Sequence, residues 1–222
     1  MYGIPGFKLD KKVVKRRVKL MEDEGVTFIT SVNIGVDILL KKLVDDFDAV
    51  VLCGGSEKPR DLPIEGRDLD GVHYAMEFLP QQNKRNEGDV VSREVAIVAK
   101  DKNVLIIGGG DTGSDCVGTS LRQGAKSVTT FELLPEPPRT RTDSNPWPQW
   151  PKTFRVSSSH EEANVREGKD KITEYCVATK KLTGKDGKVS KIHGVKMVFG
   201  DPDSKTGRAS MNEVPGSEFE LD

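Results

Sequence analysis

The fold of this 222-residue chain is decided by the stretch KNVLIIGGGDTG at residues 102–113. Residues 102–107, with the apolar run at 104–107, predict a buried strand, and a glycine-rich turn follows at once. Residues 114–123 continue as a predicted helix that ends at Gly124, and residues 127–133 predict a second strand. This order of strand, loop, helix and strand is the unit of a doubly wound α/β sheet of the Rossmann type.

The glycines of this turn match the dinucleotide-binding fingerprint G-x-G-x-x-G. Gly108 allows the tight turn after the strand, Gly110 lets the backbone approach a pyrophosphate, and Gly113 lets the helix pack close to the strand. The N-terminus of the helix offers free N–H groups and a partial positive charge to the phosphates of NADH or NADPH. The other predicted loop contacts are Gly109, Asp111 and Thr112. The alternative interpretation is a glycine-rich turn with a purely structural role.

An acidic residue at the end of the next strand provides a second test. Glu132 stands 22 residues after Gly110, close to the spacing of about 20 at which a carboxylate accepts hydrogen bonds from the adenosine ribose. Such a carboxylate favours NADH, because it repels the 2′-phosphate of NADPH. Arg139 and Arg141 follow within the next loop and could bind that phosphate instead. A solvated strand end is the structural alternative for Glu132.

The residues before the fingerprint predict a smaller set of elements. Asp10 is a candidate N-cap for a helix that ends at Gly25. Proline and glycine breakers over residues 58–72 indicate a domain boundary. The further expected elements are strands at 26–30 and 47–53 and helices at 35–44 and 74–85.

The residues after the second strand differ in character. Residues 134–150 are rich in proline and carry both tryptophans, Trp147 and Trp150, which suit either an interface or ordinary packing beneath the loop. The remaining expected elements are a helix at 161–167, strands at 175–181 and 189–199 joined by a hairpin turn at 184–187, and a polar loop at 202–215.

Composition narrows the class of protein. The 34 basic and 35 acidic side chains give a formal charge of −1, which argues against a nucleic-acid binder held by phosphate neutralisation. No apolar run is long enough for a membrane helix, and residues 1–9 lack the core of a signal peptide. The three cysteines are far apart, which argues against a disulfide framework or a metal site. A reducing, cytoplasmic setting follows.

The chain offers no pattern typical of acid–base or nucleophilic catalysis. The histidines His73, His160 and His193 are isolated, and His160 reads as part of a helix start. We therefore predict no catalytic side chain and no metal ligand. This is consistent with hydride transfer, in which a cofactor performs the chemistry and the protein orients it.

The sequence resembles the small (beta) subunit of glutamate synthase over nearly its whole length. The resemblance is carried by YGIPxFKL at 2–9, FDAVVL at 47–52, PRxLPxxG at 59–66, GGGDTGSDC at 108–116, FELLPxPP at 131–138 and NPWPQWP at 145–151. The last two runs are similar to the NADH-type enzymes of that family.

The resemblance implies an electron-input module. NAD(P)H would reduce FAD, and electrons would pass through iron–sulfur clusters outside this chain to the large (alpha) subunit, where glutamine and 2-oxoglutarate become glutamate. It also implies an FAD-binding domain interrupted by an NAD(P)H-binding domain, here residues 1–72 and 73–222. The resemblance allows a plastid location in a eukaryote.

The chain departs from the family pattern in ways that predict an internal fragment. Cys53, Gly54 and Gly55 stand where relatives usually carry Ala-Thr-Gly near the flavin, which makes Gly54 a candidate cofactor contact. The first flavin fingerprint would precede residue 2, and the closing strand would follow Asp222, so both domains are expected to be incomplete. The isolated chain is expected not to turn over, because its hydride acceptor is not held.

Two alternatives remain at this point. One is another flavin-dependent electron-input subunit that resembles the N-terminal part of dihydropyrimidine dehydrogenase, although the 145–151 run favours glutamate synthase. The other is a non-catalytic nucleotide-binding module, which bound flavin would exclude.

Overall fold

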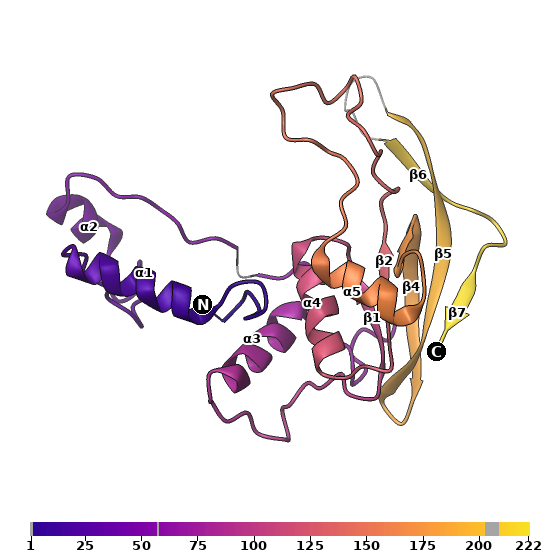
Figure 1. Cartoon of the computed structure of the whole chain (residues 1–222), viewed down its shortest axis with the longest axis horizontal. Coiled ribbons are helices and arrows are strands. Elements are labelled where there is room, and N and C mark those ends of the chain that lie inside the picture. The colour runs from indigo at the N-terminus through magenta and orange to yellow at the C-terminus, as the bar shows by residue number, and fades with distance from the viewer. Residues whose placement is uncertain (1, 57, 203–208) are drawn as a thin grey trace. The chain divides into compact units, whose positions relative to one another are not determined.

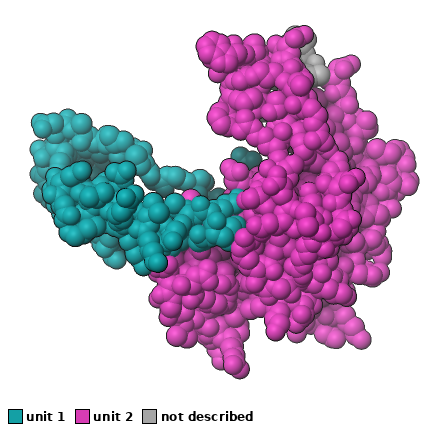
Figure 2. Space-filling view, viewed as in Figure 1, with its two compact units in different colours: residues 1, 6–60 teal, residues 2–5, 61–222 magenta. Residues whose placement is uncertain are grey.

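The chain divides into two units in the computed structural model (Figure 1), which describes residues 2–56, 58–202 and 209–222. Residues 6–60 form the first unit, and residues 2–5 with 61–222 form the second (Figure 2). The segment after Arg60 belongs to the second unit because its backbone pairs there, with bridges from Glu65 to Lys181 and from Asp70 to Lys188.

The first unit contains two helices, α1 (Lys11–Asp23) and α2 (Leu40–Asp46). The side chain of Asp10 accepts a hydrogen bond from Lys12 N at 2.8 Å, which confirms the predicted N-cap. Gly25 follows α1 with a φ of 93°, a conformation that favours glycine. α2 begins later than the predicted helix at 35–44.

The strands predicted at 26–30 and 47–53 are wrong, since neither segment forms a strand. Both lie in a unit whose described residues include no strand, and an isolated apolar run has no neighbour to accept its backbone hydrogen bonds. Val51 and Leu52 are 81% and 80% exposed instead of buried. The apolar character of the run therefore does not produce a sheet in this structure.

The second unit is built on a three-stranded parallel sheet of β1 (Asn103–Ile107), β2 (Ser127–Glu132) and β3 (Thr173–Tyr175), in the order β1-β2-β3. Helix α4 (Asp111–Arg122) connects β1 to β2, and α5 (Ser158–Glu167) precedes β3. The predicted doubly wound unit is confirmed. The predicted helix at 74–85 is also confirmed, as α3 (Ala75–Asn86).

Alternating side chains of the parallel strands enter two different cores. Val104 and Ile106 of β1 face the helices, whereas Leu105 packs on the opposite side, as the two-residue period of a strand requires. The helical core joins residues of α3, α4, α5 and β2, among them Leu79, Val117, Val128 and Ala163. The three helices therefore cover one face of the sheet (Figure 1).

An antiparallel sheet covers the other face. It contains β4 (Val177–Lys185), β5 (Lys188–Pro202), β6 (Ala209–Glu213) and β7 (Phe219–Leu221), with β6 and β7 both paired to β5. Its buried side chains, including Leu182 and Ile192, pack with Phe131 of β2. The result is a layer of helices, a parallel sheet and an antiparallel sheet (Figure 1).

The predicted hairpin is confirmed between β4 and β5. Asp186 and Gly187 at its turn have φ values of 53° and 75°, the pair of positive angles that a type I′ turn needs. The strand predicted at 175–181 is divided, because Cys176, with a φ of 56°, separates β3 from β4. The polar loop predicted at 202–215 is wrong for 209–213, where pairing with β5 makes β6, while 203–208 lie outside the described residues.

The described helices include none that is both long and apolar enough to cross a membrane.

All three cysteines are free thiols in different surroundings. Burial, with a smaller contribution from the charge of Asp115, raises the pKa of Cys116 to about 12, whereas Cys53 is exposed. Because the thiolate is the reactive form, we expect iodoacetamide at about pH 8 to modify Cys53 while sparing Cys116 until the protein is denatured. Peptide mass spectrometry checks this, and equal rates at the two thiols would contradict the buried position of Cys116.

Candidate functional site

The turn after β1 has the geometry that its glycines predict. Gly108 has a φ of 112°, and its N–H donates to the carbonyl of Phe131 at 2.8 Å. A Cβ atom at Gly113 would lie 2.2 Å from the carbonyl oxygen of Gly108. The first turn of α4 therefore packs directly on the loop, and a side chain at residue 113 would force the two apart.

The loop leaves an uncapped helix start facing open space. Gly110 is the N-cap of α4 without a side-chain hydrogen bond, and a Cβ atom built there would meet no atom within 4 Å. Among the described residues, none accepts a hydrogen bond from the amides of 110–113. These donors and the helix dipole together favour an anion at this position.

A cavity of about 660 Å³ opens beside this helix start. Its wall comes from the glycine loop and α4, from the long segment after β2, from α5 and from the region of β3. The lining residues are Gly109, Gly110, Asp111, Ser114, Arg139, Phe154, Arg155, Val156, Ser157, His160, Asn164, Asp170, Lys171, Thr173 and Tyr175. The volume lies in the range of small-molecule and cofactor sites.

The structure brings only some of the predicted residues to this cavity. Gly109, Gly110, Asp111 and Arg139 line it. Gly108, Thr112, Gly113 and Glu132 are not in the lining but belong to the loop, to the first turn of α4 and to the adjoining strand end. Arg141 donates instead to the carbonyls of Asn145 and Gln149, at 3.2 and 2.8 Å. Gly54 lies in the first unit, exposed and outside any helix or strand.

Glu132 is engaged with the backbone of the loops around it. One carboxylate oxygen accepts from Gly109 N at 2.7 Å, and the other accepts from Leu134 N at 3.0 Å. These bonds hold the glycine loop against the end of β2. A carboxylate has about four acceptor positions, so further hydrogen bonds to a ribose remain compatible with this arrangement.

The cavity wall carries a cluster of cations and aromatic rings. The Arg139 guanidinium lies 3.9 Å from the centre of the Phe154 ring and pairs with Glu136 at 2.8 Å. Lys171 also pairs with Glu136. Hydrogen bonding to Lys171 is the main reason why the pKa of the Glu136 carboxyl is lowered. Arg155 lies 4.9 Å from the centre of the Trp150 ring, and no described carboxylate forms an ion pair with it.

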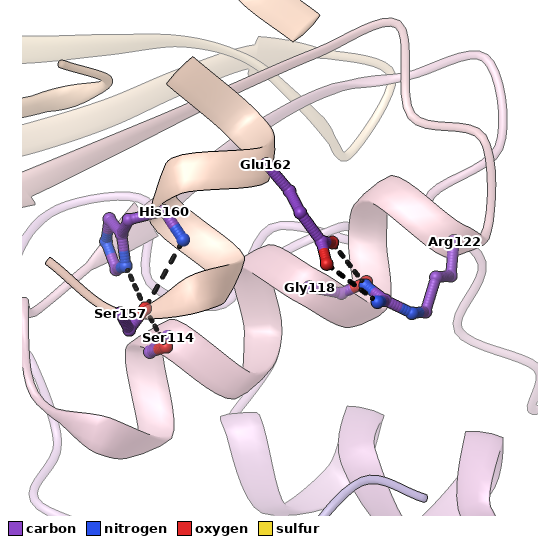
Figure 3. Close-up of polar contacts among 6 residues, drawn as sticks. All are labelled: Ser114, Gly118, Arg122, Ser157, His160 and Glu162. Carbon is purple, nitrogen blue, oxygen red and sulfur yellow. Dashed lines mark hydrogen bonds and ion pairs between the residues drawn. The ribbon is translucent and has the colours of Figure 1, made fainter. Parts of the chain in front are cut away.

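Sequence reasoning missed the second half of the wall. Ser114, Ser157 and His160 meet there in a chain of hydrogen bonds (Figure 3). The interpretation of His160 as part of a helix start agrees with its place in the first turn of α5, but that position also brings its ring to the cavity. A serine N-cap three residues before a histidine, at the start of the helix that follows the second strand, is the local signal that could have indicated this.

A comparison with models of protein families shows to which family the chain belongs. The family model of pyridine nucleotide-disulphide oxidoreductases matches residues 10–147. The chain belongs to this family. Among the described residues of the chain, no group of three or more histidine, cysteine, aspartate or glutamate side chains could hold a metal ion.

Named relatives of this family member are longer than the chain. It is 48% identical to the small chain of NADPH glutamate synthase from Mycobacterium tuberculosis H37Rv, over 100% of its own length and 43% of that protein. It is also 48% identical to the NADH glutamate synthase of Schizosaccharomyces pombe, over 98% of its length and 10% of that protein. The chain thus spans less than half of the relatives that it matches.

A solved structure shares the fold of this chain. FprA from Mycobacterium tuberculosis superposes with a TM-score of 0.66 at 18% sequence identity, covering 98% of this chain and 57% of FprA. The fold class predicted from the sequence, an α/β fold of the FAD/NAD(P)-binding type, is confirmed by this match and by the family model.

Proposed function

We propose that this chain is the NAD(P)H-binding part of a glutamate synthase electron-input module. The observation that carries the proposal is the set of amides at 110–113, which have no acceptor among the described residues and belong to a helix start whose Gly110 and Asp111 line a cofactor-sized cavity. Relatives named glutamate synthase, with 48% identity, supply the parent activity. The small-chain name favours this over the dihydropyrimidine dehydrogenase-like alternative.

The residues present fit a dinucleotide in the cavity. The amides of 110–113 would bind the pyrophosphate, because Gly110 leaves room for its approach and Gly113 fixes the helix start behind it. Glu132 would accept hydrogen bonds from the ribose, and Arg155 adds a positive charge to the wall. When bound, NAD(P)H supplies a hydride, and this chain contributes binding and orientation.

The proposed electron acceptor is FAD, as part of the proposed electron-input module. The domain assignment of 1–72 to flavin and 73–222 to NAD(P)H belongs to the same proposal. Gly54 remains the proposed flavin contact, although its exposed surroundings in the first unit show no flavin cradle, and we derive no step through it. Iron–sulfur clusters and a large (alpha) subunit complete the proposed electron path in a cytoplasmic complex.

Glu132 is expected to set the preference for NADH. In Glu132→Arg, the new guanidinium would attract the 2′-phosphate of NADPH, so we expect the ratio of the two dissociation constants to shift about tenfold toward NADPH. Both affinities should also fall, since Gly109 N and Leu134 N lose their acceptor. Titration with each nucleotide measures the ratio, and Glu132→Gln, which removes the charge without adding one, is the matched control. An unchanged ratio would assign specificity to the arginines of the following loop.

A chimaera tests the parent activity. This chain would replace the matching segment of the M. tuberculosis small chain, and bound flavin and NAD(P)H oxidation would be measured by absorbance. The proposal predicts a flavin-containing chimaera that oxidises NADH or NADPH, and the loss of that oxidation when Gly113→Val is added. A chimaera that retains flavin but oxidises neither nucleotide would favour the non-catalytic module.

A further inference from the structure

Three polar side chains connect the starts of two helices. Ser114 lies in the first turn of α4, is only 3% exposed, and places its Oγ 2.6 Å from Oγ of Ser157. Ser157 is the N-cap of α5 and accepts from His160 N at 3.3 Å. The same Oγ lies 2.9 Å from Nδ1 of the His160 ring, so the hydroxyls and the imidazole form one chain (Figure 3).

The two helices are also tied together away from the cavity. Arg122, at the end of α4, forms two hydrogen bonds to the carboxylate of Glu162 in α5, at 2.9 and 3.1 Å (Figure 3). The relative position of α4 and α5 therefore does not depend on the serine and histidine chain alone. The hydrogen bonds of that chain can therefore change direction while Arg122 and Glu162 still hold the two helices together.

The location of the serine and histidine chain indicates how it could act on a ligand. Ser114, Ser157 and His160 all line the cavity that Gly110 and Asp111 line. An anion bound by the amides of 110–113 would therefore share the cavity with both hydroxyls and with the imidazole. No other histidine lines this cavity within the described part of the chain.

The direction of the hydrogen bonds depends on the proton at His160 Nδ1. If Nδ1 is unprotonated, it accepts from the Ser157 hydroxyl, and Ser114 can then donate to Ser157. If Nδ1 carries a proton, it donates to Ser157, which then donates to Ser114, so that Ser114 no longer donates to Ser157. The imidazolium form always has that second direction and adds a positive charge.

We propose that His160 is a positioning residue that, acting through Ser157 and Ser114, makes the cavity a better binder of the dinucleotide pyrophosphate when its ring is protonated. This inference rests on the proposed nucleotide site. It assigns a second wall, supplied by α5, to a pyrophosphate that the fingerprint holds from one side. Binding of NADH is then stronger at low pH and weakens as the ring loses its proton.

Histidine is the side chain in these surroundings that suits such a role. The other titratable or charged groups lining the cavity are Asp111 from α4, Arg139 and Arg155 from the long segment, Asp170 and Lys171 before β3, and Tyr175 at the end of β3. Asp115 and Cys116 of α4 and Glu161 and Glu162 of α5 are near in sequence to Ser114 and His160. In general, carboxyl groups titrate mostly below about pH 5, and thiols, phenols and the strongly basic groups mostly above about pH 8.

The test is the pH profile of NADH binding to the full chain, measured by nicotinamide fluorescence between about pH 6 and pH 8. NADH is the probe because its pyrophosphate keeps its charge over this range, whereas a 2′-phosphate would titrate. For the wild type we expect the dissociation constant to rise about five- to tenfold across the range, as one charge-assisted interaction is lost.

Variants separate a positioning role from a purely structural one. His160→Gln should flatten the profile and weaken binding about fivefold at low pH while leaving the high-pH affinity near that of the wild type. Ser157→Ala should also flatten it, and Ser157→Thr, which retains the hydroxyl and the cap, should restore the slope. His73→Gln, at an exposed residue outside the cavity, is the matched control and should keep the wild-type profile.

The outcomes distinguish this inference from the function on which it rests. A wild-type protein that is folded by circular dichroism but binds no NADH at any pH would overturn the proposed function and this inference with it. Saturable NADH binding with a flat profile, or a slope that survives in His160→Gln, would overturn the role of His160 alone. An equal loss of affinity at every pH in His160→Gln would also contradict it, because a structural defect has that signature.

Discussion

Gly113→Val is expected to weaken NADH binding by about a hundredfold or more, since at least two charge-assisted hydrogen bonds from the loop amides are lost together. The physical cause is the 2.2 Å that separates a Cβ atom at this residue from the carbonyl oxygen of Gly108. Backbone cannot yield as a flexible side chain does, so α4 must move away from the loop, and its amides no longer converge on one phosphate position. Titration by nicotinamide fluorescence measures the loss.

Substitutions at two further glycines test whether the effect of Gly113→Val is specific to its position. Gly6→Val is the matched control, because a Cβ atom there meets nothing within 4 Å and the residue lies in the other unit. Gly110→Ala also meets no protein atom, so we expect an unchanged melting temperature together with weaker NADH binding, as the methyl group occupies space meant for the ligand. Wild-type affinity in Gly113→Val would refute the assignment of the fingerprint.

Phe131→Ala is expected to cause the largest loss of stability. Phe131 is 1% exposed, joins the parallel sheet to the antiparallel sheet, and meets Phe219 edge-on with ring centres 5.7 Å apart. Replacing a fully buried phenylalanine by alanine costs about 3–5 kcal/mol of unfolding free energy. Urea unfolding followed by circular dichroism measures this change.

An exposed phenylalanine provides the comparison. Phe47 is 62% exposed in the first unit, so Phe47→Ala should change the unfolding free energy by less than about 0.5 kcal/mol. Similar unfolding midpoints for Phe131→Ala and the wild type would mean that the two sheets do not share the core described for them.

Local sequence predicts the parts of this fold that depend on neighbouring residues. The apolar run before Gly108, the glycine spacing and the cap at Asp10 act over a few residues, and the structure agrees with each. The run at 47–53 has the same apolar character as β1, yet it forms no strand, because strand formation depends on a partner elsewhere in the chain. An apolar run in the sequence does not by itself show whether such a partner strand exists.

The candidate site likewise has one part that local sequence predicts and another part that it does not predict. The loop at 108–113 was predictable because the spacing of its glycines determines its conformation. The opposite wall was not, since Ser157 and His160 reach Ser114 across 43 residues or more of intervening chain through the packing of α5 on α4. The position of Glu132 was predicted from its spacing, but its bonds to Gly109 N and Leu134 N require the folded turn.

The most direct test of nucleotide binding at the glycine loop is a titration of the purified chain with NADH and with NADPH. It is followed by nicotinamide fluorescence and by tryptophan fluorescence, to which Trp150 contributes with a ring that contacts Arg155 at the cavity wall. We expect saturable binding of NADH that Gly113→Val removes. Absence of saturable binding by either nucleotide, in a chain shown to be folded by circular dichroism, would contradict the account.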